Sequence, residues 1–138
     1  MPVTPAVAES AREAMYRYAR AVDDADESAL AACLHSDVVL HRVDGARTGR
    51  DEVLAFYRTV FDGPTSWSKH FVGNISCSGD DRAVDVHAYF QAVALTEAGP
   101  TLVFGEYNDR LVADRSGGLL LAIKSIDVQL TIPLGAPK

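Results

Sequence analysis

The fold is decided by the stretch Trp67–Ile132, WSKHFVGNISCSGDDRAVDVHAYFQAVALTEAGPTLVFGEYNDRLVADRSGGLLLAIKSIDVQLTI. β-Branched and aromatic residues gather in four long runs within it, which predict strands. Turn-rich linkers, SGDD, TEAGP and DRSGG, separate these runs. Short connections between long strands favour antiparallel neighbours in a meander. The expected strands are Trp67–Ser76, Ala83–Leu95, Leu102–Ala113 and Leu119–Ile132.

Helical periodicity dominates the first part of the chain. From about Val7 to Ala25, apolar residues recur at three- and four-residue steps, which predicts an amphipathic helix. Asp24 followed by Glu27 resembles a capping box, so a second helix is expected from there to about Leu34. The apolar stripe of the first helix comprises Ala11, Met15, Tyr18, Ala19 and Val22.

One more strand and one more helix precede the four long strands. DVVLHRV, residues 37–43, predicts a strand, and RDEVLAFYRTVF, residues 50–61, predicts an amphipathic helix, with a glycine-punctuated loop between them. A sheet of this length must curl, and helices can cover its concave face. We find no domain boundary, so residues 1–138 are expected to form one α+β domain: a curved, mostly antiparallel sheet with three N-terminal helices over its concave face.

Composition and charge exclude several classes of partner. The chain has a formal net charge of -6 and a pI of about 5.0, which disfavours binding to nucleic acid or to an anionic membrane surface. No apolar run approaches the roughly 20 residues that a membrane-spanning helix needs. The N-terminus lacks a basic region followed by an apolar one, so a cytoplasmic protein without a signal peptide is expected.

Motifs for cofactors, metals and nucleophilic serines are missing from the sequence. It contains no GxSxG, no P-loop, no GxGxxG and no HExxH. Its four histidines lack the close spacing of metal ligands. We therefore predict a protein with no cofactor and no metal site.

Four segments carry a family resemblance: YARAVDDAD (Tyr18–Asp26), LHSDVVLH with GRDEVLAFY, KHFVGNIS (Lys69–Ser76) and GEYNDRLV (Gly105–Val112). Together with the element order, they make the chain resemble the NTF2-like superfamily, and within it the SnoaL-like group, over nearly its full length. The resemblance implies the NTF2-like cone. It is less specific for activity, because this fold hosts dehydratases, isomerases, epoxide hydrolases, cyclases and non-catalytic modules.

The resemblance also implies a catalytic pair. Scytalone dehydratase, bile-acid dehydratase and hexachlorocyclohexane dehydrochlorinase use an acid on the first helix and a histidine on the strand after the third helix. The matching positions here are Asp23 and His70. Two positions depart from scytalone dehydratase, since Val22 and Val93 stand where that enzyme has a tyrosine and a second histidine. The base aspartate of ketosteroid isomerase would fall near Arg42.

Strand alternation supports His70 as a cavity residue. Ser68, His70, Val72, Asn74 and Ser76 should share one face of their strand. A polar group on the face that meets the helices needs a partner or a purpose. Asp23 could orient the imidazole and stabilise the imidazolium, as carboxylates do behind catalytic histidines. The alternative is a structural histidine that is merely hydrogen-bonded to Asp23.

Six further residues are candidates for contact with a substrate. His41, at the end of the first strand, is either a pocket donor or a surface histidine. His87 and Tyr89 share one face of Ala83–Leu95; hydrophobicity places Val84, Val86, Ala88 and Phe90 inward, whereas the resemblance to scytalone dehydratase suggests the reverse. Tyr107 is expected to reach the cavity, and Asp109 with Arg110 to form a surface pair. The substrate-binding candidates are His41, Tyr107, His87, Tyr89, Trp67 and Phe56.

The leading hypothesis is a cofactor-independent dehydratase, isomerase or cyclase. His70 would act as general base, oriented by Asp23, on an apolar polyketide- or terpenoid-like substrate, with Tyr107 or His41 donating a hydrogen bond to the developing oxyanion. The alternative is a non-catalytic ligand-binding or assembly subunit, similar to the NTF2-like β subunits of ring-hydroxylating oxygenases. A homodimer or homotrimer is expected, because open sheets of this kind usually hide one face by self-association.

Overall fold

The computed structural model describes residues 2–135. Within that range the chain forms three helices and six strands, and the predicted element order is confirmed. The helices and strands are α1 (Pro5–Asp23), α2 (Glu27–Cys33), β1 (Leu34–Arg42), β2 (Gly45–Thr48), α3 (Arg50–Phe61), β3 (Thr65–Gly79), β4 (Ala83–Thr96), β5 (Gly99–Ala113) and β6 (Leu119–Pro133).

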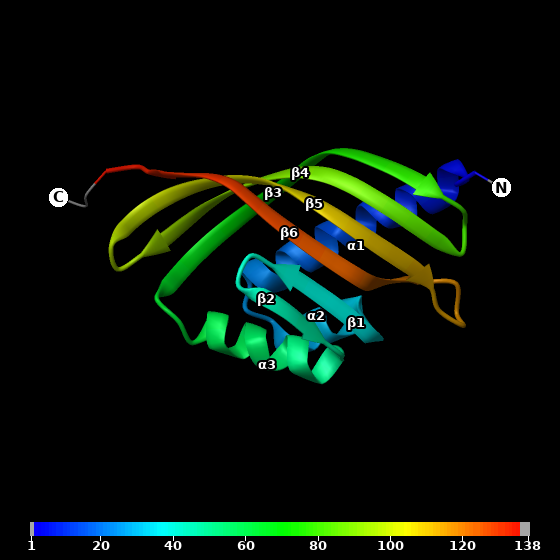
Figure 1. Cartoon of the computed structure of the whole chain (residues 1–138), viewed down its shortest axis with the longest axis horizontal. Coiled ribbons are helices and arrows are strands. Elements are labelled where there is room, and N and C mark those ends of the chain that lie inside the picture. Colours follow the sequence, from blue (N-terminus) through cyan, green and yellow to red (C-terminus); the bar gives the residue numbers. More distant parts are fainter. Residues whose placement is uncertain (1, 136–138) are drawn as a thin grey trace.

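The described strands form one sheet in the order β2-β1-β6-β5-β4-β3. The four long strands make the predicted antiparallel meander, and β1 joins it parallel to β6. Figure 1 shows these strands arching over the helices, which lie on the concave side of the sheet. The predicted α+β class with a curved, mostly antiparallel sheet is therefore confirmed.

Capping residues set the bounds of the first two helices. Thr4 caps α1 and Pro5 occupies its first turn, where a missing backbone N–H costs nothing. Asp24 was expected to cap α2, but its backbone N–H donates to Arg20 O at 2.9 Å and so ends α1. Asp26 caps α2 instead, accepting a hydrogen bond from Ala29 N at 3.0 Å. The prediction of Asp24 as the cap was wrong, because Asp24 still belongs to the C-terminal end of α1 and α2 begins three residues later.

The expected loop between the first strand and the third helix contains a short strand. Residues of β2 pair with β1 in a hairpin, with Leu40 opposite Arg47 and Arg42 opposite Gly45. Gly45 has φ +122°, a backbone conformation that suits glycine. The hairpin carries two arginines to the edge of the space between sheet and helices.

A β-bulge changes the faces of β3. The register of β3 against β4 shifts between Gly73 and Ser76, where Asn74 adopts φ +48°. An extra residue at a bulge swaps the side-chain alternation beyond it. Ile75 and Cys77 therefore pack against the core, whereas Ser76 is exposed. The expectation that Ser76 shares the inward face of His70 is wrong for this reason.

The faces of β4 follow hydrophobicity. Val84, Val86, Ala88 and Phe90 are all buried against the helices. Their alternates point away from the helices, and Tyr89 is half exposed. The reverse orientation suggested by the likeness to scytalone dehydratase is wrong, because it would expose four apolar side chains to water.

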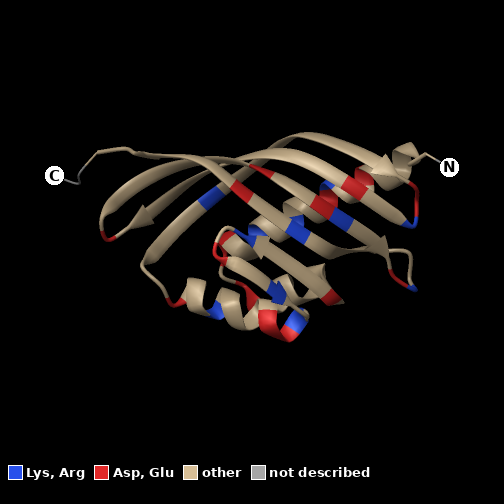
Figure 2. Ribbon diagram, in the orientation of Figure 1, with Lys and Arg blue, Asp and Glu red and all other residues tan. Residues whose placement is uncertain are grey.

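The outer face of the sheet is partly apolar, with Phe71, Tyr89 and Leu130 all exposed. Self-association through this face stays a prediction. Acidic and basic positions are interspersed in Figure 2 rather than gathered into one basic stripe. No helix within residues 2–135 is long and apolar enough to cross a membrane.

Candidate active site

A cavity of about 300 Å³ lies between the helices and the concave face of the sheet. Its walls come from α1, α3, the end of β1 and the four long strands, and they are mostly apolar: Val22, Val60, Phe61, Phe90 and Val103 contribute. A space of this size and character suits a small apolar molecule. The polar lining residues are Tyr18, Asp23, Arg42, Tyr57, Thr65, Ser66, Ser68, His70 and Tyr107.

Asp23 and His70 meet in the wall of this cavity. Asp23 Oδ1 lies 2.5 Å from His70 Nδ1, and Asp23 Oδ2 accepts the backbone N–H of His70 at 2.8 Å. Ser68 Oγ donates to the same carboxylate at 2.9 Å. Because Asp23 is the last residue of α1 and β3 runs past it, both elements fix the pair.

This arrangement assigns a tautomer to His70. A carboxylate accepts hydrogen bonds, so the proton of a neutral imidazole belongs on Nδ1. His70 Nε2 then carries the free lone pair, and it makes no hydrogen bond with any residue in 2–135. The His70 side chain is 22% exposed, whereas the Asp23 side chain is only 6% exposed. The free nitrogen thus belongs to a residue that lines the cavity and reaches solvent.

Hydrogen bonds keep the Asp23 carboxylate ionised. Burial alone would raise the pKa of Asp23, but hydrogen bonds from the side chain and backbone of His70 and from Ser68 outweigh it. The pKa of Asp23 therefore lies below its usual value. An ionised carboxylate at this position can stabilise a positive charge on the imidazole.

Tyr107 presents an unused hydroxyl to the cavity. Its ring stacks on Phe90 with centroids 4.3 Å apart, and Lys124 Nζ lies 3.3 Å from the ring centroid. The side chain is mostly buried and lines the cavity, and its hydroxyl makes no hydrogen bond with another described residue. Burial raises the pKa of Tyr107 well above its usual value, so the hydroxyl keeps its proton and can donate it in a hydrogen bond.

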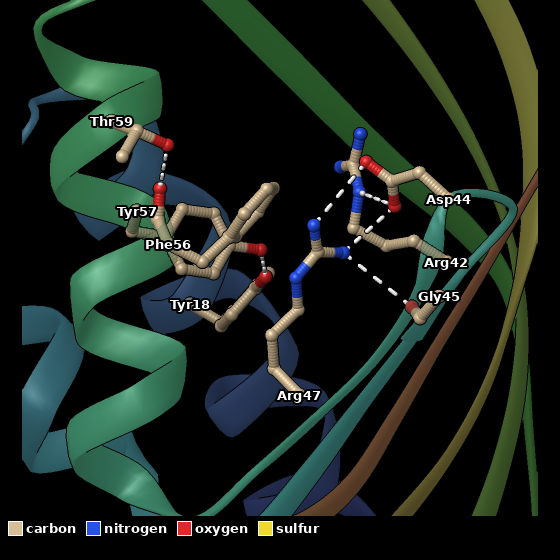
Figure 3. Close-up of polar contacts among 8 residues, drawn as sticks. All are labelled: Tyr18, Arg42, Asp44, Gly45, Arg47, Phe56, Tyr57 and Thr59. Atoms are coloured by element: carbon tan, nitrogen blue, oxygen red, sulfur yellow. Dashed lines mark hydrogen bonds and ion pairs between the residues drawn. The ribbon is translucent and has the colours of Figure 1, made fainter.

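Two further tyrosines close the helix side of the cavity. The hydroxyl groups of Tyr18 on α1 and Tyr57 on α3 are in hydrogen-bonding contact, and Figure 3 shows them facing each other. Burial, with a contribution from the Asp109 charge, raises the pKa of Tyr57. Tyr57 therefore stays neutral, and both hydroxyl groups offer polar atoms beside the apolar walls.

A buried ion pair supports the floor behind Tyr107. Lys124 Nζ donates to Asp109 Oδ2 at 2.8 Å, and both side chains are buried. Burial raises the pKa of Asp109 and lowers that of Lys124. The expected surface pair of Asp109 with Arg110 is wrong, because Arg110 points outward and binds Asp85 at 2.8 Å.

Three of the predicted substrate-binding residues lie away from the cavity. His41 is exposed, because the alternation of β1 turns Leu40 and Arg42 inward. His87 and Tyr89 lie on the outer face of the sheet, where His87 Nε2 is 2.5 Å from Glu106 Oε1. These three residues face the wrong way to touch a molecule in the cavity.

The other two aromatic candidates lie at its edge. Trp67 borders the cavity but is 46% exposed, and its ring lies 5.7 Å from Lys69 Nζ. Phe56 is absent from the lining and instead lies beneath Arg42 and Arg47.

Sequence reasoning missed several cavity residues. Ser68 shares its strand face with His70, so alternation alone could have assigned it to the site. Arg42 lies two residues after buried Leu40 and so shares its face of β1, and alternation could likewise have assigned Arg42 to the cavity. Tyr18 and Tyr57 read as ordinary core positions of amphipathic helices, and nothing in the sequence sets them apart.

Within residues 2–135, no cluster of three or more His, Cys, Asp or Glu side chains could hold a metal. The prediction of no cofactor stays a prediction.

The sequence matches the family described as SnoaL-like domain over residues 7–122. Similar solved structures include a candidate scytalone dehydratase from Novosphingobium aromaticivorans DSM 12444 (18% identity, TM-score 0.81, covering 94% of each chain). A hexachlorocyclohexane dehydrochlorinase, LinA Type2, is 15% identical (TM-score 0.83, covering 92% of this chain and 88% of that one). A cystatin-like protein of unknown function from Nostoc punctiforme PCC 73102 is 21% identical (TM-score 0.78, covering 94% and 96%).

These structural likenesses show a shared fold. No curated protein sequence matches the chain significantly.

Proposed function

The chain belongs to the SnoaL-like domain family, and from this premise we propose that it is a cofactor-independent small-molecule enzyme in which His70 acts as general base. The family includes dehydratases, isomerases and cyclases. The proposed reaction is an elimination, isomerisation or ring closure that begins with loss of a proton from an acidic C–H or O–H group.

One observation carries the proposal: Asp23 binds both the backbone N–H and the Nδ1 of the same histidine. A neutral imidazole has one N–H donor and one acceptor nitrogen, and a purely structural buried histidine would normally have both satisfied. Here the carboxylate fixes the ring and its tautomer, while Nε2 has no partner among residues 2–135 and lies in a mostly apolar cavity. Preorganisation of this kind is what a general base requires.

The proton would move from the substrate to His70 Nε2, while Nδ1–H stays hydrogen-bonded to Asp23. The ionised Asp23 stabilises the imidazolium without taking its proton. The imidazolium then returns the proton to a leaving hydroxyl or to another carbon of the substrate, which restores the resting state. General-base catalysis of this kind contributes about two to four orders of magnitude to a rate.

Tyr107 supplies the complementary hydrogen-bond donor. Proton abstraction next to a carbonyl places negative charge on the carbonyl oxygen, and a neutral hydroxyl in an apolar site stabilises that charge. Tyr107 takes this role rather than His41, which is exposed outside the cavity.

Hydrogen–deuterium exchange tests the proposal before the natural substrate is known. A panel of cyclic ketones is incubated with the protein in deuterated buffer, and exchange of the C–H hydrogens next to the carbonyl is followed by proton NMR. We expect the wild type to accelerate exchange in at least one compound, and His70→Gln to reduce this by about a hundredfold or more. His41→Gln is the matched control and should exchange normally. Equal exchange by His70→Gln and wild type would discard the mechanism.

A further inference from the structure

The hairpin of β1 and β2 places two arginines and one aspartate beside the cavity. Arg42 belongs to the cavity lining, and Arg47 does not. In Figure 3 the side chains of Arg42 and Arg47 lie between the hairpin and α3, and the Asp44 carboxylate lies beside both guanidinium groups. The charges of Asp44 and of Glu52, on α3, both act on Arg47, so the local negative charge is directed mainly at Arg47 rather than at Arg42.

Asp44 makes its shortest hydrogen bond with Arg47. Arg47 Nη1 donates to Asp44 Oδ1 at 2.7 Å, and Nη2 approaches Oδ2 at 3.4 Å. The hydrogen bond from Arg47 is the largest influence on Asp44, and with the nearby charges of both arginines it lowers the pKa of this carboxyl to about 2. Asp44 therefore stays ionised and neutralises Arg47 first.

Arg42 keeps most of its hydrogen-bonding capacity. Only its Nε binds Asp44, at a long 3.3 Å, and its two Nη atoms donate no hydrogen bond to any residue in 2–135. The Arg42 guanidinium lies 4.8 Å from the centroid of the Phe56 ring. The Arg47 guanidinium lies 4.1 Å from the centroid of the same ring. The Arg42 side chain is 34% exposed. It is therefore positioned by packing while its terminal donors remain free.

Arg42 is also the one lysine or arginine among the described residues that line the cavity. Lys124 lies behind Tyr107 and is neutralised by Asp109. At the dyad, Asp23 is saturated by hydrogen bonds from Ser68 and His70. An anionic group in the cavity would therefore find its complementary charge at Arg42.

We infer that Arg42 recognises a carboxylate on the substrate, so that the molecule bound in the cavity has an apolar body and one carboxylate. A guanidinium presents parallel donors that match the two oxygens of a carboxylate. A monoanion fits this site better than a phosphate dianion, which the neighbouring Asp44 carboxylate would repel more strongly. This inference names the substrate class of the enzyme proposed above and rests on that proposal for its catalytic meaning.

Calorimetric titration with two matched ligands tests the inference. The ligands are 1-adamantanecarboxylate and its neutral analogue 1-adamantanecarboxamide, which share one rigid apolar body. We expect the wild type to bind the carboxylate about tenfold or more tightly than the carboxamide, because hydrogen bonds to a charged partner are stronger than neutral ones. Arg42→Gln should abolish this preference and leave carboxamide binding unchanged, which also shows that the cavity is intact.

Two variants complete the experiment. Arg58→Gln makes the same substitution at an arginine that binds Glu27 on the helix surface, and it should retain the full preference. Asp44→Asn removes the competing carboxylate and should strengthen carboxylate binding. Equal affinity of the wild type for both ligands would overturn the inference, as would a preference that survives Arg42→Gln or failure of both ligands to bind at millimolar concentration.

The result can be separated from that of the exchange experiment, because binding requires no turnover. His70→Gln should keep the carboxylate preference even though it loses catalysis. Loss of the preference in Arg42→Gln together with normal exchange by His70→Gln would support the anion site and contradict the general base. A preference that survives Arg42→Gln, together with loss of exchange in His70→Gln, would contradict the anion site and support the general base.

Discussion

Asp23 Oδ1 lies 2.5 Å from His70 Nδ1, and Asp23 Oδ2 simultaneously accepts the backbone N–H of His70 at 2.8 Å. One carboxylate thus ties the end of the first helix to the first long strand and fixes the orientation of an imidazole. The hydrogen bonds between these two residues have a structural role and, in the proposed mechanism, a chemical one, and the two can be separated by experiment.

The structural role predicts a pH-dependent stability. The folded state lowers the pKa of Asp23, so its stabilising effect is complete above the unfolded-state pKa of about 3.9 and is lost as the pH falls through the lower folded-state pKa. Asp23→Asn should reduce the free energy of unfolding by about 1–3 kcal/mol at neutral pH, because buried hydrogen bonds to a charged group are lost. Urea unfolding at neutral pH and near pH 3 measures the change, which should shrink in acid.

Asp37→Asn provides the control for that experiment, since Asp37 is exposed on β1 and should show little effect at either pH. A destabilisation by Asp23→Asn that is equally large at both pH values would show that the carboxylate charge contributes nothing.

Tyr107→Phe should separate catalysis from packing. The substitution keeps the stacking on Phe90 and the contact with Lys124 but removes the free hydroxyl. We expect the free energy of unfolding to change by less than about 0.5 kcal/mol and proton exchange to slow by about a hundredfold. Urea unfolding and the exchange assay measure the two effects. Tyr89→Phe, on the outer face, should leave both unchanged; an equal loss of exchange there would remove the special role of Tyr107.

The buried pair of Lys124 and Asp109 predicts strong coupling between two substitutions. Lys124→Met leaves Asp109 buried without its partner and should cost about 3–5 kcal/mol of stability. Adding Asp109→Leu removes the unpaired charge and should recover much of that loss. Urea unfolding of the single and double variants gives the coupling free energy, and additive effects would contradict the account. Arg110→Met, which breaks the exposed contact with Asp85, should have little effect.

The choice of cap between two neighbouring aspartates gives a direct local test. Asp26→Ala removes the side-chain hydrogen bond to Ala29 N and should destabilise the protein by about 1 kcal/mol. Asp24→Ala should cost clearly less, because Asp24 contributes its backbone N–H to the end of α1 and that group survives the substitution. Thermal or urea unfolding of both variants decides between them. A larger loss for Asp24→Ala would contradict the assignment of the cap.

Periodicity in the sequence was sufficient for most of the fold. Helical spacing predicted α3 at residues 50–61, and runs of β-branched residues separated by turn linkers predicted the meander. For β4, hydrophobicity favoured the inward face of Val84, Val86, Ala88 and Phe90 that the structure shows, but the likeness to scytalone dehydratase left the orientation open. These features follow from local hydrophobicity, which a sequence displays directly.

Features that depend on tertiary contacts were beyond such patterns. The bulge at Asn74 reverses the faces of the second half of β3, and the preceding Gly73 is its only local signal, one that is also compatible with an unbroken strand. Lys124 reads as a solvent-facing lysine until the fold places Asp109 opposite it on β5. At the site, Asp23 and His70 are 47 residues apart and were paired through a family resemblance, whereas Arg42 needed the inward turn of β1 to be recognised.

The most direct test of the central claim is the tautomer of His70, measured from imidazole nitrogen-15 shifts in mildly alkaline buffer. We predict a proton on Nδ1 and an unprotonated Nε2 in the wild type, and a shift of this population in Asp23→Asn. A proton on Nε2, or a population indifferent to Asp23, would contradict the claim that Asp23 prepares His70 as a base.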